Sequence, residues 1–183
     1  MGYTAIDVLK IAEAEIGYLE KASNSQLDDK TANAGNKDYT KYARDLAEAG
    51  YYQSSKQGFA WCDIWFDWIH YIAAGKNAKL AQKVTYQTGP YGAGCIYSAK
   101  YYQQAGRFDT TPQIGDQIFF KNSSGTVCHT GIVYDVDNSY VYTIEGNTSS
   151  STGVIANGGC VRKKQYSLNY TRIAGYGHPA YDG

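Results

Sequence analysis

The chain has 183 residues, and its 17 Lys and Arg balance 17 Asp and Glu, which gives a formal net charge of zero. This length suits one domain with a single core. The balanced charge argues against a broad cationic surface, on which binding to nucleic acid or to an anionic membrane depends. We therefore expect neither of these partners, and we expect a monomer.

Tyrosine is the abundant aromatic residue, with 19 copies against 5 Phe and 3 Trp. One interpretation places the tyrosines at half-buried positions of a sheet, which suit this side chain. The other places some of them along a groove for sugar or peptide, because tyrosine combines an apolar ring with a polar tip. The second interpretation predicts a cleft lined with tyrosines.

Helical periodicity dominates the first half of the chain. Over residues 4–20 apolar side chains recur every three or four positions, and Thr4 with Asp7 resembles a capping box. No basic segment followed by a long apolar run is present, so we expect no signal peptide and no membrane span. A long polar loop follows at 20–37, and such loops are commonly functional or mobile. Further helices are expected over residues 39–50, 61–74 and 97–104.

The second half of the chain has the pattern of strands. Short runs rich in Ile, Val, Tyr and Phe are separated by turns that contain Asn, Ser, Asp and Gly. Helices followed by an antiparallel meander predict an α+β domain with the helices packed on one side of a curled sheet. The expected strands cover residues 116–121, 129–135, 139–145, 159–165 and 173–178.

The four cysteines lack the C-x-x-C spacing of a structural zinc site, so we expect none. Cys62 follows a loop and begins a predicted helix. A thiol in this position faces free backbone N–H groups and the positive end of the helix dipole, which stabilise a nucleophilic thiolate. The same N–H groups can bind the oxyanion of a tetrahedral intermediate. The alternative is that Cys62 only packs beside Trp61 and Trp65.

A base for Cys62 is expected at the start of a later strand. His129 begins one predicted strand, and Glu145 and Asn147 follow in the next. Residues two positions apart share one face of a sheet. If the two strands pair, Glu145 or Asn147 can bind the ring nitrogen of His129 that faces away from the thiol, and so orient the ring. His70, inside a core helix, and His178, in the C-terminal tail, are weaker candidates.

Four sequence blocks together carry a family resemblance. They read GFAWCD at 58–63, GDQIFF at 115–120, HTGIV at 129–133 and IEGN at 144–147. In this order the blocks resemble a CHAP domain, a cysteine- and histidine-dependent amidohydrolase/peptidase of the papain-like NlpC/P60 superfamily. The first helix and the segment after it are also similar to the CHAP domains of phage endolysins and related cell-wall enzymes.

The resemblance implies a papain-like NlpC/P60 fold and a single catalytic domain over residues 1–183. It implies that Cys62 is the nucleophile, His129 the general base and Glu145 the residue that orients it, with Asn147 as a fourth polar member. The implied activity is hydrolysis of peptidoglycan, either at the muramoyl–alanine amide or at a peptide or cross-bridge bond. Two alternatives are a wall-binding module without catalysis and an amidase acting on another peptide.

The place of action implied by the resemblance is the bacterial cell wall. Without a signal peptide, we expect either a phage-encoded enzyme released on lysis or a domain of a secreted protein. No cofactor is expected. Some CHAP domains hold calcium, and four residues in and directly after the polar loop offer oxygen ligands. Their spacing is not that of a calcium-binding loop, so the better interpretation is a solvated segment. These residues are Asp28, Asp29, Asn36 and Asp38.

Two cysteines depart from the family pattern. Cys128 directly precedes the base, and Cys160 stands in a glycine-rich turn. Strand alternation predicts that Cys128 faces away from His129. If their strands are neighbours, Cys128 and Cys160 can form a disulfide. Cys95 is expected to be a small core residue. The walls of the substrate groove are expected at 20–37, at Tyr51 and Tyr52, and at 86–91.

Overall fold

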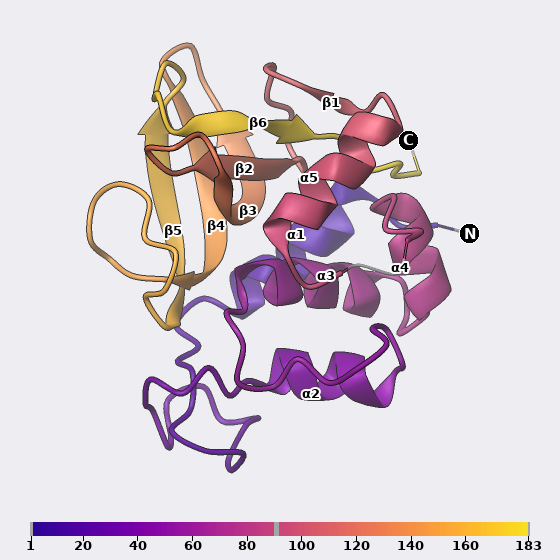
Figure 1. Ribbon diagram of the computed structural model, residues 1–183, viewed down its shortest axis with the longest axis vertical. Helices are drawn as coiled ribbons and strands as arrows, with labels where there is room; N and C mark the ends of the chain where they lie inside the picture. The colour runs from indigo at the N-terminus through magenta and orange to yellow at the C-terminus, as the bar shows by residue number, and fades with distance from the viewer. Residues whose placement is uncertain (1, 90–91, 183) are drawn as a thin grey trace.

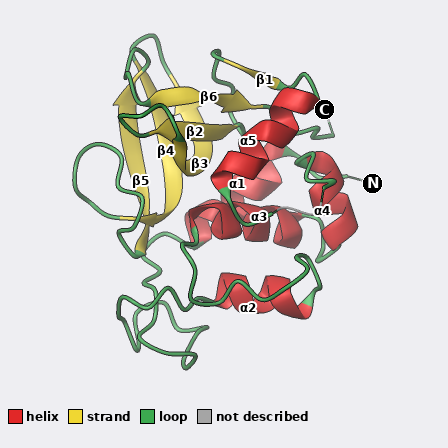
Figure 2. Ribbon diagram, viewed as in Figure 1, coloured by secondary structure: helices red, strands yellow, loops and turns green. Residues whose placement is uncertain are grey.

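The computed structural model describes residues 2–89 and 92–182. In these residues a group of helices precedes a sheet, as Figures 1 and 2 show. The helices are α1 (Ala5–Ala14), α2 (Lys41–Glu48), α3 (Cys62–Ala73), α4 (Ala78–Val84) and α5 (Cys95–Gln104). The strands are β1 (Phe108–Asp109), β2 (Gln117–Lys121), β3 (Val127–Val136), β4 (Tyr140–Thr148), β5 (Cys160–Ser167) and β6 (Ile173–Gly177).

The sheet has the order β1-β6-β2-β3-β4-β5, and its paired strands are antiparallel. Strands β2 to β5 form the expected meander, whereas β6 returns to the other edge and pairs with β2 and β1. The helices gather on one side of the sheet, with α3 central (Figure 1). The α+β prediction is therefore confirmed. No helix of the described chain has the length and apolar character required to cross a bilayer.

The first helix begins as predicted and ends earlier. The Thr4 hydroxyl accepts the Asp7 N–H, and the Asp7 carboxylate accepts the Thr4 N–H at 2.9 Å, so the capping box is present. The prediction of helix to residue 20 was wrong, because α1 ends at Ala14. Gly17 adopts a φ of 91°, and its N–H donates to the Val161 carbonyl at 3.0 Å. The chain thereby leaves the helix and pairs with the first residues of β5.

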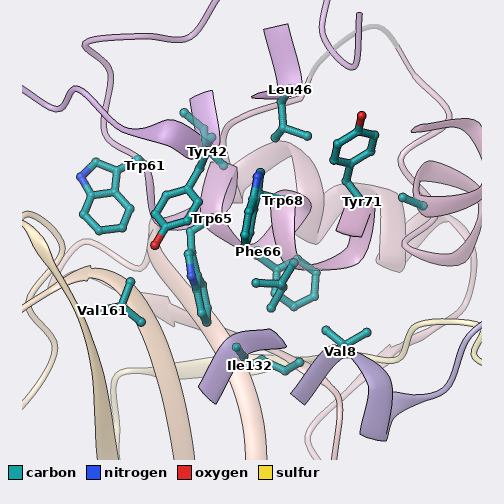
Figure 3. Close-up of a cluster of buried hydrophobic side chains, with 14 of the residues drawn as sticks. Val8, Tyr42, Leu46, Trp61, Trp65, Phe66, Trp68, Tyr71, Ile132 and Val161 are labelled. Carbon is teal, nitrogen blue, oxygen red and sulfur yellow. The ribbon is translucent and has the colours of Figure 1, made fainter. Parts of the chain in front are cut away.

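Aromatic side chains build the core between α3, α2 and the sheet. Trp61 and Trp65 of the α3 segment are fully buried, and Tyr42 of α2 contacts both Trp61 and Trp68, with ring centroids 5.6 Å and 4.9 Å away (Figure 3). Burying such rings removes a large apolar area from water. This core fixes α3 against β3 and β4, where Ile132 and Ile144 complete it.

Eight tyrosines of the described chain are buried in the cores. The hydroxyl of Tyr42 donates to Glu15 Oε2, and that of Tyr18 donates to the Leu27 carbonyl, both at 2.8 Å, whereas the Tyr102 hydroxyl is buried without a hydrogen-bond partner in the described chain. Three of the eight, Tyr42, Tyr71 and Tyr102, lie on helices, so the prediction of half-buried strand positions explains only some of the tyrosines. The eight are Tyr3, Tyr18, Tyr42, Tyr51, Tyr71, Tyr102, Tyr166 and Tyr176.

The suggested disulfide between Cys128 and Cys160 was wrong. Cys128 lies on β3 and Cys160 on β5, and β4 lies between them. Strands two apart in a sheet are separated by roughly 10 Å, beyond the Cα separation of about 4.4–6.8 Å that a disulfide allows. Cys160 instead pairs with Thr148, and all four thiols are free.

Candidate active site

Cys62 is the first residue of α3, as the sequence predicted. Trp61 precedes it as N-cap without a side-chain hydrogen bond to the helix, which leaves the N–H groups of the first turn to the site. The Asp63 N–H donates to the Cys62 sulfur. The side chain is buried, with 6% of its surface exposed. Position and hydrogen bonding together favour a thiolate at Cys62.

His129 and Glu145 meet on the neighbouring strands β3 and β4. The Nε2 atom of His129 lies 2.8 Å from Glu145 Oε2, and both side chains are completely buried. The Thr143 hydroxyl donates to the other carboxylate oxygen at 2.6 Å. The Phe120 ring stacks on the imidazole at 5.8 Å between centroids. Both the carboxylate and the imidazole are thus fixed in orientation.

The second ring nitrogen of His129 is available to the nucleophile. Nδ1 is buried and has no hydrogen-bond partner in the described chain, and the interaction of the imidazole with the Cys62 thiol lowers the pKa of Cys62 and raises that of His129. Helix α3 packs directly on β3 and β4, which brings the thiol to the ring. The structure therefore places Cys62, His129 and Glu145 in the linear arrangement of a nucleophile, a base and an orienting acid.

The charges of this group favour a thiolate beside an imidazolium. A hydrogen bond from Cys95 and the hydrogen bond and charge of His129 lower the pKa of Cys62 well below its ordinary value. Burial alone lowers the pKa of His129, but hydrogen bonds and charges from Cys62 and Glu145 outweigh it and raise that pKa to about 10. Between these two pKa values both groups carry the charge that catalysis by a thiol requires.

Asn147 does not contact His129, and Glu145 takes the orienting position by itself. The Oδ1 atom of Asn147 accepts the Gly159 N–H at 3.1 Å, and its carbonyl accepts the Gly158 N–H at 2.8 Å. Its backbone is left-handed, with φ of 55°. Asn147 therefore holds the turn before β5 next to the site, while its Nδ2 atom is buried without a partner in the described chain.

Two glycines in the motif strands are required by close packing. A Cβ at Gly131 would lie 2.6 Å from Glu145 Cγ, and one at Gly146 would lie 2.7 Å from Trp65 Cβ. Real Cβ atoms do not approach other atoms so closely, so a larger residue would displace the carboxylate or the helix. The sequence motifs HTGIV and IEGN thus contain glycine where β3, β4 and α3 are in contact.

We expect Gly131→Ala to impair catalysis more than stability. The new methyl group forces Glu145 away from His129, and a displacement near 1 Å can cost about 10²-fold in rate. Overpacking of this kind costs about 1–3 kcal/mol of stability. Activity on cell walls and thermal unfolding are measured together. Gly125→Ala is the control for lost stability alone, because its φ of 82° strains an alanine while a Cβ there meets nothing within 4 Å and lies outside the site. Wild-type activity in Gly131→Ala would show that this contact does not position Glu145.

A buried polar network beneath Cys62 was not predicted. Asp63 accepts hydrogen bonds from Ser98 Oγ at 2.8 Å and from Gln117 Nε2 at 2.9 Å. Burial, and then the charge of Cys62, raise the pKa of Asp63 to about 7. The network continues through Gln87 to Asp67, which also accepts the Tyr52 hydroxyl. It joins α5 to α3 directly beside the nucleophile.

Cys95 lies at the same place. It is the first residue of α5, it is buried, and the interaction of its thiol with Cys62 is the largest cause of a raised pKa at Cys95. The prediction that Cys95 is a core residue is confirmed by its packing with Ala99, Tyr102 and Phe119, but the contact with Cys62 was missed. No sequence signal reveals it, because 33 positions separate the two residues.

The structure places parts of the expected groove walls, and a substrate groove at Cys62 stays a prediction. Tyr51 and Tyr52 line a hollow of about 260 Å³ together with residues 87–89, while residues 90–91 of the predicted wall lie outside the described chain. The polar loop at 20–37 is anchored beside the nucleophile, since Trp61 Nε1 donates to Glu20 Oε2 at 2.9 Å. Burial raises the pKa of this Glu20 carboxyl.

Three of the four residues considered for calcium have separate partners. Asp28 pairs with Arg44 at 2.6 Å, Asp29 accepts the N–H groups of Thr31 and Ala32, and Asp38 interacts with Glu20. In the described residues no group of three or more His, Cys, Asp or Glu side chains can hold a metal ion.

The two other histidines lie in separate hydrogen-bonded positions. His70 Nδ1 is 2.8 Å from the Tyr3 hydroxyl, and burial lowers the pKa of His70 to about 3. His178 lies 2.8 Å from Asp116 and 3.1 Å from Asp109. Cys128 is the extra residue of a bulge opposite Phe120 and Lys121, so strict alternation does not fix its direction.

The sequence and the fold both resemble those of known proteins. The model of the CHAP domain family matches residues 54–147, which include the three residues of the site and Asn147. The crystal structure of Ly7917 is similar, with a TM-score of 0.54 and 13% identity over 96% of this chain and 62% of that chain. A second structure, Ly7917 with the hydrolyzing product of MDP, matches with a TM-score of 0.54, 14% identity and the same coverage. These identities show a shared fold alone, and no curated protein matches the sequence.

Proposed function

This chain belongs to the CHAP domain family, and we propose that it is a peptidoglycan hydrolase that cuts an amide bond through a cysteine nucleophile. Two interactions of His129 carry the proposal. Its Nε2 atom lies 2.8 Å from Glu145 Oε2, and its ring interacts with the Cys62 thiol. A charged thiolate, a buried imidazole and a fixed carboxylate are the groups that acyl transfer requires.

The proposed reaction proceeds through a thioester. The Cys62 thiolate attacks the carbonyl carbon of the amide, and the Cys62 N–H at the start of α3 stabilises the oxyanion. His129, protonated, gives its proton to the leaving amine. Water then attacks the thioester while the imidazole takes a proton from it. Glu145 keeps the ring in orientation and stabilises its positive charge throughout.

Peptidoglycan as substrate is supported by the fold neighbour. One structure of Ly7917 contains the hydrolyzing product of MDP. The chain spans 62% of the length of that protein, so the comparison supports the substrate class and not a particular bond. The bond remains the muramoyl–alanine amide or a peptide or cross-bridge amide, and the proposed place of action is the bacterial cell wall.

The two alternatives have less support. A binding module without catalysis has no need of a buried carboxylate that raises the pKa of His129 to about 10. An amidase for another peptide would use the same three residues, so only the substrate separates it from a wall hydrolase.

Digestion of purified sacculi tests the proposal. We expect new free amines in the wild-type digest and none with Cys62→Ala as control. Mass spectrometry identifies the bond: new amines on alanine next to muramic acid indicate an amidase, and amines on a diamino or bridge residue indicate an endopeptidase. A folded wild-type protein that releases no amine from sacculi of several cross-bridge types would overturn the assignment to peptidoglycan.

A further inference from the structure

A second thiol contacts the sulfur of the proposed nucleophile. Cys95 and Cys62 begin the helices α5 and α3, Ser98 of α5 donates to Asp63 of α3 at 2.8 Å, and the interaction between the two thiols is the largest influence on the pKa of each. Both are buried, with 9% and 6% of their surfaces exposed. Each is a free cysteine. The mechanism above makes no use of the Cys95 thiol.

The fold holds the two thiols together by contacts on both sides. Ser98, one turn after Cys95 on α5, donates to Asp63, the residue after Cys62, at 2.8 Å. Behind the pair, Cys95 packs in a cluster with Ala99, Tyr102 and Phe119. The beginnings of α5 and α3 are therefore joined at neighbouring positions in each helix, and the approach of the two sulfurs is a consequence of tertiary packing.

We propose that Cys62 and Cys95 form a reversible oxidation site, in which a peroxide converts the two thiols to an intramolecular disulfide that blocks the nucleophile. The Cys62 thiolate attacks a peroxide oxygen, the O–O bond breaks, and Cys62 becomes a sulfenic acid as hydroxide leaves. Cys95 then loses its proton to that hydroxide and its sulfur attacks the Cys62 sulfur. The S–S bond forms as the S–O bond breaks, and the oxygen leaves as hydroxide, which takes the proton that Cys62 had given to His129 and becomes water.

The balance of this reaction closes with one peroxide. Two thiols lose two electrons and two protons, and hydrogen peroxide takes them up to become two waters. A dithiol reverses the change by exchange, and is itself oxidised to a disulfide. The two sulfurs must approach to about 2.0 Å to form the disulfide, which requires the cysteine side chains to rotate about their torsion angles.

The charges around the pair fit the order of these steps. The hydrogen bond to Cys62, followed by burial and the Cys62 charge, raises the pKa of Cys95, so that Cys62 is the thiol that reacts first. Oxidation of Cys62 to a neutral sulfenic acid removes that charge and makes the Cys95 thiol easier to ionise. Without Cys95, a sulfenic acid at Cys62 would proceed to a sulfinic acid, which thiol reductants do not reverse.

Cys128 is the competing partner. Its thiol interacts electrostatically with Cys95, but it also accepts a hydrogen bond from Arg172 Nη2 at 3.8 Å. It lies in the β3 bulge and not at a helix beginning. Cys62 is the stronger partner, because it has the largest influence on the pKa of Cys95 and Cys128 has the smallest.

Peptide mapping after peroxide treatment tests the proposal without reference to the substrate. Wild-type protein is treated with hydrogen peroxide, alkylated and digested. We expect a peptide pair linked through Cys62 and Cys95, with Cys128 and Cys160 still alkylated, and loss of the link after dithiothreitol. Sulfinic acid at Cys62 in the wild type, or a link to Cys128, would overturn the proposal even if the protein proves to hydrolyse peptidoglycan.

The activity arm uses Cys95→Ser and its matched control Cys160→Ser. Peroxide should inactivate wild type and Cys160→Ser alike, and dithiothreitol should restore both. Cys95→Ser should lose activity permanently, with sulfinic acid at Cys62. Full recovery of Cys95→Ser would contradict the proposal. If Cys95→Ser fails to fold, or if no variant has wall activity, the mapping of the wild type still decides the question.

Discussion

Replacing Cys62 with alanine is expected to reduce kcat by about 10⁴-fold or more, because the covalent step loses its nucleophile. The side chain is small and lies at the first position of α3, so the helix is retained. His129 and Glu145 keep their contact in the variant, since it does not depend on the thiol. Release of amines from purified sacculi measures the rate, and circular dichroism with thermal unfolding measures the fold.

The control for this prediction is a buried cysteine outside the site. Cys160 begins β5 and pairs with Thr148, and Cys160→Ala should keep wild-type activity. Cys62→Ser should be nearly as inactive as Cys62→Ala, because a hydroxyl is not ionised by a neighbouring imidazolium as a thiol is. A folded Cys62→Ala that retains a tenth or more of wild-type activity would remove Cys62 from the mechanism.

The positions of Cys62 and His129 in the fold follow from local pattern. The position of Cys62 depends on where one helix begins, and a loop followed by apolar periodicity reveals that in the sequence. The partnership of His129 with a residue of the next strand depends on one hairpin and on period-two alternation. The alternation left Glu145 and Asn147 equivalent, and the left-handed backbone of Asn147 separates them in the structure.

The parts that depend on tertiary packing were not predictable from one sequence. Cys95 reaches Cys62 because α5 packs across the beginning of α3, and no periodicity encodes that crossing. The disulfide suggestion failed because it required β3 and β5 to be neighbours, whereas β4 lies between them. The early end of α1 depends on the bond from Gly17 to Val161, which is 144 positions away in the chain. Strand order and helix crossings are long-range choices.

The beginnings of two helices meet at the nucleophile. Cys62 starts α3 and Cys95 starts α5, and the Asp63 N–H in the first turn of α3 interacts with the Cys62 sulfur. Helix N-termini favour negative charge. The buried Asp63 opposes this, because its pKa of about 7 leaves part of its population charged near neutral pH. The thiolate is thus stabilised mainly by donors and by His129, with a buried acid whose charge varies with pH beneath it.

Replacing Glu145 with glutamine is expected to lower kcat by about 10²- to 10⁴-fold and to shift the pH profile. The hydrogen bond and the negative charge of Glu145 both raise the pKa of His129, which stands at about 10. The basic limb of kcat/KM marks the loss of the His129 proton. Glutamine keeps the shape and can still accept the Thr143 hydroxyl, but it removes the charge, so the His129 pKa falls and the basic limb moves to lower pH.

A pH profile of kcat/KM between about pH 5 and 11 measures this effect. Glu13→Gln is the matched control, because Glu13 is exposed and pairs only with Lys163 at 3.1 Å. Its profile should coincide with that of the wild type. Loss of stability alone would lower the rate of Glu145→Gln at every pH without moving the limb. A basic limb that stays at the wild-type position would therefore show that Glu145 does not act through the charge of His129.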